Sequence, residues 1–189
     1  MSGTAPESGT ETGKVDGRRV YTGRIISVDL DTVRFPDGST GQLEMIRHPG
    51  ASAVVPVLRA DLPDPEILLI RQYRCAAEQY LYEVAAGRLD AGEAPEVCAA
   101  RELREETGYR AERLTPLFTM YTTPGFTDER IHLFVATGLT AGDAAREADE
   151  FLELVPMPLS RALDLIKDGA IQDAKTALAL LHAARFVLV

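Results

Sequence analysis

One segment constrains this chain more than any other: GRLDAGEAPEVCAARELREETGY, Gly87–Tyr109. Pro95 suits the first turn of a helix, apolar residues recur at helical spacing and Gly108 supplies a stop, so the pattern predicts a helix between them. Residues three and four apart lie on the same helix face. Three acids near the end of this helix are therefore expected to converge on one point: Glu102, Glu105 and Glu106.

This position is unfavourable for three acids. Like charges at this spacing destabilise an isolated helix by roughly 0.2–0.5 kcal/mol a pair, and the last turn is the negative end of the helix dipole. A bound cation would compensate both effects. Mg²⁺ or Mn²⁺ fits, because hard cations choose oxygen ligands. The alternative is a solvated, charged helix face, which is the ordinary explanation of an isolated acidic cluster.

The segment is similar to the Nudix box, the motif of the Nudix hydrolases. That motif is glycine, five residues, glutamate, seven residues, Arg-Glu, an aliphatic, one residue, Glu-Glu, one residue and glycine. Seven fixed identities would coincide by chance on the order of once in 10⁸ windows. Tyr109, where the family more often has an aliphatic residue, is the one departure. The matching residues are Gly87, Glu93, Arg101, Glu102, Leu103, Glu105, Glu106 and Gly108.

The resemblance implies a metal site. Glu102 and Glu106 are expected to bind Mg²⁺ or Mn²⁺ directly. The backbone carbonyl of Ala86 is expected as a further ligand, with Glu105 close by or acting through water.

Other residues of the box are expected to be structural. Arg101 should reach back to Glu93 in a charge-assisted contact that fixes the loop against the helix. Gly87 and Gly92 are expected to let the backbone turn tightly before the helix, and Gly108 to end it.

The flanking sequence resembles the ADP-ribose pyrophosphatase branch of the family from about Tyr21 to the C-terminus. That branch carries a proline about 16 residues past the box, and Pro124 meets this requirement. Enzymes that hydrolyse GDP-mannose and other nucleotide sugars are close kin. The resemblance rests on four segments: RQYRCAA, LYEVAAG, TTPGFTDE and DGAIQDAKT.

The same resemblance implies substrate-binding residues. Arg74 is expected to bind the diphosphate, since a guanidinium fork makes paired contacts; its alternative role is a surface ion pair at a strand end. Glu129 matches a residue that contacts the ribose or the metals, and Gly125 lets its loop approach the ligand. Glu44 lies where family dimers place residues in the partner's site. The adenine contact stays open among Tyr21, Arg24 and Ile25.

The catalytic base is expected in the acidic run READEFLE, residues 146–153, because relatives place a glutamate of this loop in the site. Glu150 is the first candidate and Glu147 the second, with Glu105 as the candidate from the helix. Taken alone, such a run is usually a solvated loop.

The order of elements predicts an α+β fold, which by resemblance is the Nudix α/β/α sandwich with a mixed sheet, plus N-terminal antiparallel strands. Residues 1–17 are expected to be a disordered tail, 18–58 the N-terminal strands and 51–189 the catalytic domain. The first strands either pack on the main domain or form a small sheet of their own. Pro36–Ser39 predicts a turn, and Ser160 a helix cap.

Composition narrows the classes of molecule that this protein is expected to bind and the compartment in which it is expected to work. The net charge of −9 disfavours nucleic acid and anionic membranes, and no apolar run approaches the about 20 residues of a transmembrane helix. The first residues lack the apolar core of a secretory signal. Two cysteines without a CxxC pair fit a reducing cytoplasm. The resemblance adds a homodimer whose N-terminal strands cross to the partner.

The function implied is Mg²⁺-dependent hydrolysis of ADP-ribose to AMP and ribose 5-phosphate. Two alternatives stay open: a nucleotide-sugar pyrophosphatase of the GDP-mannose type, and a catalytically silent module that binds a nucleotide and regulates a partner. The number of metal ions, the identity of the base and the adenine contacts also stay open.

Overall fold

The structure of this chain, a computed structural model, describes residues 11–142 and 152–188. It forms two compact units. The first consists of Met1–His48 and Tyr121–Glu129, and the second of Pro49–Met120 and Arg130–Val189. Among the described residues, no helix has both the length and the hydropathy needed to cross a bilayer.

The first unit is built on a three-stranded antiparallel sheet in the order β1-β2-β3. Its strands are β1 (Gly13–Thr22), β2 (Ser27–Arg34) and β3 (Thr40–Arg47). The predicted turn joins β2 to β3, and there the Phe35 N–H donates to the Ser39 carbonyl over 2.8 Å. The first strands thus form a small sheet of their own. Residues 13–17, which were expected to belong to a disordered tail, lie in β1.

Buried acids hold this small sheet together. Asp29 and Asp31 of β2 are both buried. Arg47 of β3 binds both of them, and Arg19 and Lys14 of β1 bind one each. Hydrogen bonding to Arg19 lowers the pKa of Asp29 to about 2 against the opposing effect of burial. In this small sheet, ion pairs therefore supply part of the stabilisation that an apolar core supplies in a larger sheet.

The second unit contains the mixed sheet. Its order is β10-β5-β4-β9-β8, with β6 paired to β5 and β7 to β4. Strands β4 and β9 are parallel, whereas β4 pairs antiparallel with β5 and with β7. The strands are β4 (Ala51–Arg59), β5 (Glu66–Arg74), β6 (Gln79–Glu83), β7 (Ala85–Arg88), β8 (Tyr109–Tyr121), β9 (Arg130–Ala141) and β10 (Leu152–Pro158).

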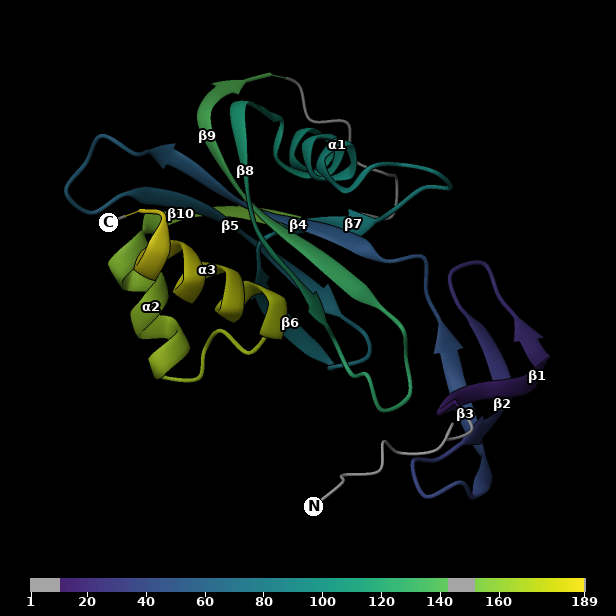
Figure 1. The fold of residues 1–189 in the computed structure, drawn as a ribbon. Coiled ribbons are helices and arrows are strands. Elements are labelled where there is room, and N and C mark those ends of the chain that lie inside the picture. The colour runs from purple at the N-terminus through teal and green to yellow at the C-terminus, as the bar shows by residue number, and fades with distance from the viewer. Residues whose placement is uncertain (1–10, 143–151, 189) are drawn as a thin grey trace, which may run out of the picture. The chain divides into compact units, whose positions relative to one another are not determined.

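Helices cover both faces of this sheet. Helix α1 (Pro95–Thr107) lies on one side, and α2 (Leu159–Lys167) and α3 (Ala174–Phe186) lie on the other (Figure 1). Successive strand residues point to opposite faces, so Val54 packs in the α1 core while Val55 packs in the core under α2 and α3. The predicted α/β/α sandwich is confirmed.

Of the helix-end signals predicted from the sequence, Gly108 agrees with the structure and Ser160 does not. Gly108 ends α1 with φ +79°, and its N–H donates to the Arg104 carbonyl over 2.9 Å. Asp173 caps α3 by accepting from the Thr176 N–H. Ser160 is not a cap, since α2 begins at Leu159. Its hydroxyl instead donates to Asp64 over 2.6 Å.

The boundary between the units differs from the expected one. The N-terminal region was expected to reach residue 58, but β4 lies in the middle of the large sheet and belongs to the second unit. The loop Tyr121–Glu129 joins the first unit, because its backbone pairs with β3. The Ile46 N–H donates to the Phe126 carbonyl over 2.7 Å, and Arg47 binds Asp128 over 3.1 Å.

Candidate active site

Gly87 makes room for a buried carboxylate. It lies in β7, which packs beside α1, and a Cβ on Gly87 would lie 2.0 Å from the Glu102 Oε1. Its φ is not in the left-handed region, whereas Gly92 has φ +78°. The expectation that Gly87 serves a tight turn is therefore corrected: the position is glycine because the Glu102 carboxylate, itself 7% exposed, occupies that space.

Glu106 lies one helical turn further along and is 5% exposed. Its carboxylate accepts a hydrogen bond from the Ala86 N–H over 3.0 Å. In an antiparallel pair, a residue whose N–H points away from the neighbouring strand turns its C=O away too. Ala86 faces Ala53 of β4 in the register, so its carbonyl lies on the edge of β7 that faces α1.

Arg101 ties the start of the box to its end. Its Nε and one Nη each donate to Glu93 over 2.9 Å, which confirms the predicted contact. Hydrogen bonding to Arg101 lowers the pKa of Glu93 to about 2 despite the opposing effect of burial. The other Nη donates to Glu102 over 2.5 Å and to Glu105 over 3.2 Å.

Glu105 is bound by two arginines. Besides Arg101, Arg104 donates to it over 2.9 Å. As the side chains lie, no three acidic, histidine or cysteine residues in the described part of the chain form a metal-sized group. The expected convergence of all three carboxylates on one point is thus not present in this arrangement of side chains, in which one Nη of Arg101 bridges Glu102 and Glu105.

The remaining donors fit a divalent cation. Glu102 and Glu106 are buried acids on one helix face, and the Ala86 carbonyl faces the same helix. All three groups offer hard oxygen, and magnesium typically takes one or two carboxylates with the rest of its shell from water and substrate phosphates. The space left by Gly87 adds room beside the Glu102 carboxylate.

Arg74 takes part in an ion pair, the alternative role considered for it. Its Nε and one Nη donate to the buried Glu83 over 2.6 and 2.8 Å. Lys175 at the start of α3 binds the same carboxylate. Burial alone would raise the pKa of Glu83, but the hydrogen bonds and charges of Arg74 and Lys175 outweigh it and lower the value to about 2.

This ion pair leaves part of Arg74 available. A guanidinium carries five N–H donors, and the pair with Glu83 uses one on Nε and one on Nη2. Hydrogen bonding to Glu83 raises the pKa of Arg74 against burial, and the charge of Glu106 raises it further. Arg74 therefore lies within electrostatic reach of Glu106, with donors to spare.

Sequence reasoning missed Glu83 and Lys175. Both stand in segments quoted for the family resemblance, LYEVAAG and DGAIQDAKT. The available signal was that Glu83 is the lone acid in the mostly apolar segment LYEVAAG. Such an acid needs a basic partner when buried, although that rule does not say where in the chain the partner lies.

The other expected site residues are divided between the units or fall outside the description. Glu44 on β3 is exposed, and Gly125 has open space where a Cβ would stand. Glu129 accepts from the Thr122 hydroxyl over 2.9 Å and lies 3.4 Å from His48. These three belong to the first unit, and the box to the second. Glu147 and Glu150 lie outside the described residues.

Comparison with known proteins agrees with these features. A family model described as the NUDIX domain matches residues 47–180. The chain is 41% identical over 163 residues to the methanol dehydrogenase activator of Bacillus methanolicus, covering 85% of this chain and 86% of that protein. It is 39% identical over 164 residues to the ADP-ribose pyrophosphatase of Bacillus subtilis, covering 86% of each. A crystal structure of an ADP compounds hydrolase matches with a TM-score of 0.80 and 26% identity, covering 96% of this chain and 97% of that one.

Proposed function

Because this chain belongs to the Nudix family, we propose that it hydrolyses the diphosphate bond of ADP-ribose to AMP and ribose 5-phosphate, with Mg²⁺ or Mn²⁺ as its cofactor. The observation that carries the proposal is the pair of buried acids, Glu102 and Glu106, beside Gly87. Two buried carboxylates on one helix face repel each other, and a divalent cation between them would offset that repulsion in addition to the Arg101 contact of Glu102. The choice of ADP-ribose is supported by two similar proteins, one named as an ADP-ribose pyrophosphatase and the other as an ADP compounds hydrolase.

In this proposal, one set of groups binds the metal ion and another binds the diphosphate. Glu102, Glu106 and the Ala86 carbonyl would hold the metal ion, which would supply positive charge to neutralise the diphosphate and to activate the attacking water. Arg74 gives its remaining N–H donors to a phosphate oxygen, since a guanidinium matches that geometry. Glu83 fixes the Arg74 side chain by two hydrogen bonds.

The proton released by the attacking water needs a carboxylate acceptor. Glu150, then Glu147, remain the proposed bases from the acidic run, and Glu105 is the candidate on α1. A carboxylate near cations stays ionised at neutral pH, as a base must. Glu129, Gly125 and Glu44 remain proposed substrate contacts.

A homodimer in the cytoplasm is part of the same proposal. The first unit leaves large apolar side chains exposed, which in a small sheet favours a covering partner. These residues include Val15, Val20, Tyr21, Ile25 and Leu43. Light scattering during size exclusion should give twice the chain mass, and a monomer mass would contradict the dimer. The two free thiols suit a reducing compartment.

The reaction is tested with a substrate panel. Purified chain with Mg²⁺ is incubated with ADP-ribose, GDP-mannose and other nucleoside diphosphate sugars, and the phosphomonoester products are separated by chromatography. The proposal expects AMP and ribose 5-phosphate, with ADP-ribose giving the highest kcat/KM. A higher kcat/KM for GDP-mannose would favour the nucleotide-sugar alternative instead.

A second candidate is a regulatory module without turnover. It is favoured by the similarity to a protein named as a methanol dehydrogenase activator. Against it stands the intact acid pair, because a silent module has no need to keep two buried carboxylates close together. Tight ADP-ribose binding by calorimetry, with no turnover on any diphosphate, would favour this candidate over hydrolysis.

A further inference from the structure

A hollow of about 470 Å³ lies between the outer surface of α1 and the start of β8. We call it the arginine pocket, because three of its six lining residues are arginines and none is acidic. The lining residues are Val97, Ala100, Arg101, Arg104, Arg110 and Ala111. Its volume falls in the range of small-molecule sites, about 300–1,000 Å³. In a chain with net charge −9, such a local excess of positive charge calls for an explanation.

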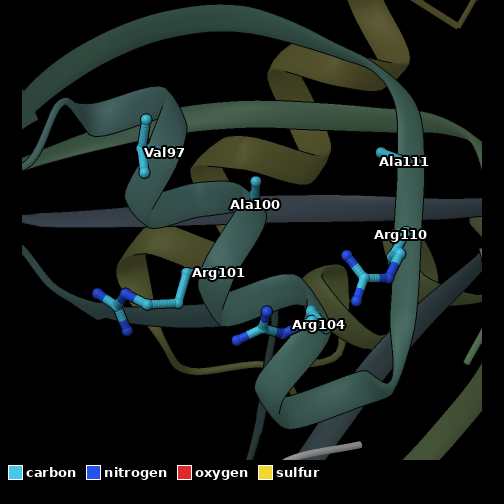
Figure 2. Close-up of a pocket in the computed structure, with 6 residues that line it drawn as sticks. All are labelled: Val97, Ala100, Arg101, Arg104, Arg110 and Ala111. Carbon is cyan, nitrogen blue, oxygen red and sulfur yellow. The ribbon is translucent and has the colours of Figure 1, made fainter. Parts of the chain in front are cut away.

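Arg104 and Arg110 line the hollow from different elements. Figure 2 shows Arg110 reaching from β8 toward α1, while the side chains of Arg104 and Arg101 lie on α1 and point away from Arg110. Arg101 is engaged with Glu93, Glu102 and Glu105. The donors available to a ligand are therefore those of Arg104 and Arg110.

Both of these arginines have unused donors. Among the residues that the structure describes, the Arg110 side chain has no hydrogen bond or ion pair. Arg104 donates to Glu105 through one Nη, but its Nε is buried without a partner. A buried donor left unpaired is unfavourable, so the Arg104 Nε calls for an acceptor that none of the described residues supplies.

The chemistry of the lining indicates the ligand. Arginine matches phosphate and carboxylate through its fork of donors. Two cations with no acid among the lining residues suit a dianion, and a phosphomonoester carries close to two negative charges at neutral pH. Val97, Ala100 and Ala111 add apolar surface for an organic group, and Val97 is 58% exposed.

We propose that the arginine pocket binds a small phosphomonoester, with Arg104 and Arg110 donating to its phosphate group and the apolar residues contacting its organic part. Binding at this site does not depend on the proposed reaction. The site is connected to the buried carboxylate pair, because its lining residue Arg101 binds Glu102 and its lining residue Arg104 binds Glu105, which neighbours Glu106. A phosphate that takes Arg104 donors changes the partner of Glu105, the residue before Glu106.

The test is an NMR titration of the ¹⁵N-labelled full chain, free of metal and at low salt, since salt screens exposed charges. The two probes are inorganic phosphate and AMP. Saturable shifts are expected at the backbone amides of Arg104, Arg110 and Ala111, extending to Glu105. Tighter binding of AMP than of inorganic phosphate supports the organic contact, and equal binding assigns the site to the phosphate group alone, which overturns the apolar part of the proposal.

The matched variants are Arg110→Ala and Arg113→Ala. Arg113 is an exposed arginine of the same strand that does not line the pocket. Loss of one charge-assisted contact should weaken binding about tenfold or more in Arg110→Ala and leave it unchanged in Arg113→Ala. No saturable shift at the pocket amides with either probe, or equal affinity in Arg110→Ala and the wild type, would overturn the proposal. Turnover of ADP-ribose by Arg110→Ala shows separately that the proposed reaction is intact.

Discussion

Glu83 is the buried acid at which two basic side chains meet. Arg74 at the end of β5 and Lys175 at the start of α3 both bind its carboxylate, and Lys175 also lies 3.0 Å from Asp173. The arrangement fixes a partly exposed arginine near Glu106. At the scale of single residues, Glu83 therefore acts as a positioning group for Arg74.

A double-mutant cycle tests this role. Glu83→Gln should lower kcat/KM for ADP-ribose by about tenfold or more, because it removes charge-assisted hydrogen bonds. In an Arg74→Ala background the same change should have little further effect, since the group it positions is gone. Effects that simply add would instead indicate a general structural role for Glu83.

The control for this cycle is Glu153→Gln. Glu153 pairs with Arg71 of the same strand β5 over 3.3 Å, but its side chain is 65% exposed. Exposed pairs contribute about 0–1 kcal/mol, so this variant should keep near-normal kcat/KM and stability.

The low pKa of Glu83 predicts a pH dependence of stability. Its pKa falls from 4.5 to about 2 on folding, so its contribution is complete above the unfolded value and is lost as pH drops toward the folded value. The difference in unfolding free energy between wild type and Glu83→Gln should shrink by about 2 kcal/mol from about pH 7 to about pH 3. Urea denaturation at the two pH values measures it, and an unchanged difference would count against the ion cluster.

Gly87 offers a second prediction at this scale. A Cβ here meets the end of the Glu102 side chain, not backbone, so Gly87→Ala should move that carboxylate with little cost in stability. Affinity for Mn²⁺, measured by calorimetry, should fall about tenfold or more, while the melting temperature stays close to that of the wild type. Unchanged Mn²⁺ affinity would show that the Glu102 carboxylate does not need this space.

At the scale of elements, the helices place the site. Helix α1 places the acid pair against β7. Helix α3 places Lys175 beside Glu83, although the two residues are 92 positions apart in the chain. The start of α3 is fixed by Asp173, which accepts hydrogen bonds from the Thr176 N–H and hydroxyl over 3.0 and 2.6 Å. Asp173 thus caps α3 and also belongs to an ion cluster with Glu83, Arg74 and Lys175.

Asp173→Ala should destabilise the chain by about 1 kcal/mol or more through loss of this cap. It should also raise KM for ADP-ribose, because Lys175 loses one of its two partners. Asp168→Ala, at the end of α2, is the matched control and should be near neutral in both measurements. Thermal unfolding and steady-state kinetics give the two readouts, and a neutral Asp173→Ala would contradict the capping role.

The comparison of sequence with structure is also clearest at this scale. Helix α1, its glycine stop and the Arg101–Glu93 contact were predictable because their signals are local. Ser160 failed as a predicted cap because Asp64, 96 residues away in the chain, takes its hydroxyl. Lys175 and Glu83 are 92 residues apart, and a pairing at that separation leaves no periodic pattern to read.

At the scale of the whole molecule, the chain is organised as two units that the sequence order does not separate. The β8–β9 connection, Tyr121–Glu129, belongs to the first unit although both flanking strands belong mainly to the second. Its backbone pairing with β3 is long-range, so no local sequence signal assigns this connection to the first unit. The expected substrate contacts Gly125 and Glu129 belong to the first unit and the acid pair to the second.

The most direct test of the account compares ADP-ribose turnover with Mg²⁺ in wild type, Glu106→Gln and Glu96→Gln. Glu96 is an exposed acid in the first turn of the same helix, so its variant should keep normal turnover. Glu106→Gln should stay folded and lose about a hundredfold or more, because it removes a buried oxygen donor for the metal. Near-normal turnover by a folded Glu106→Gln would contradict the account.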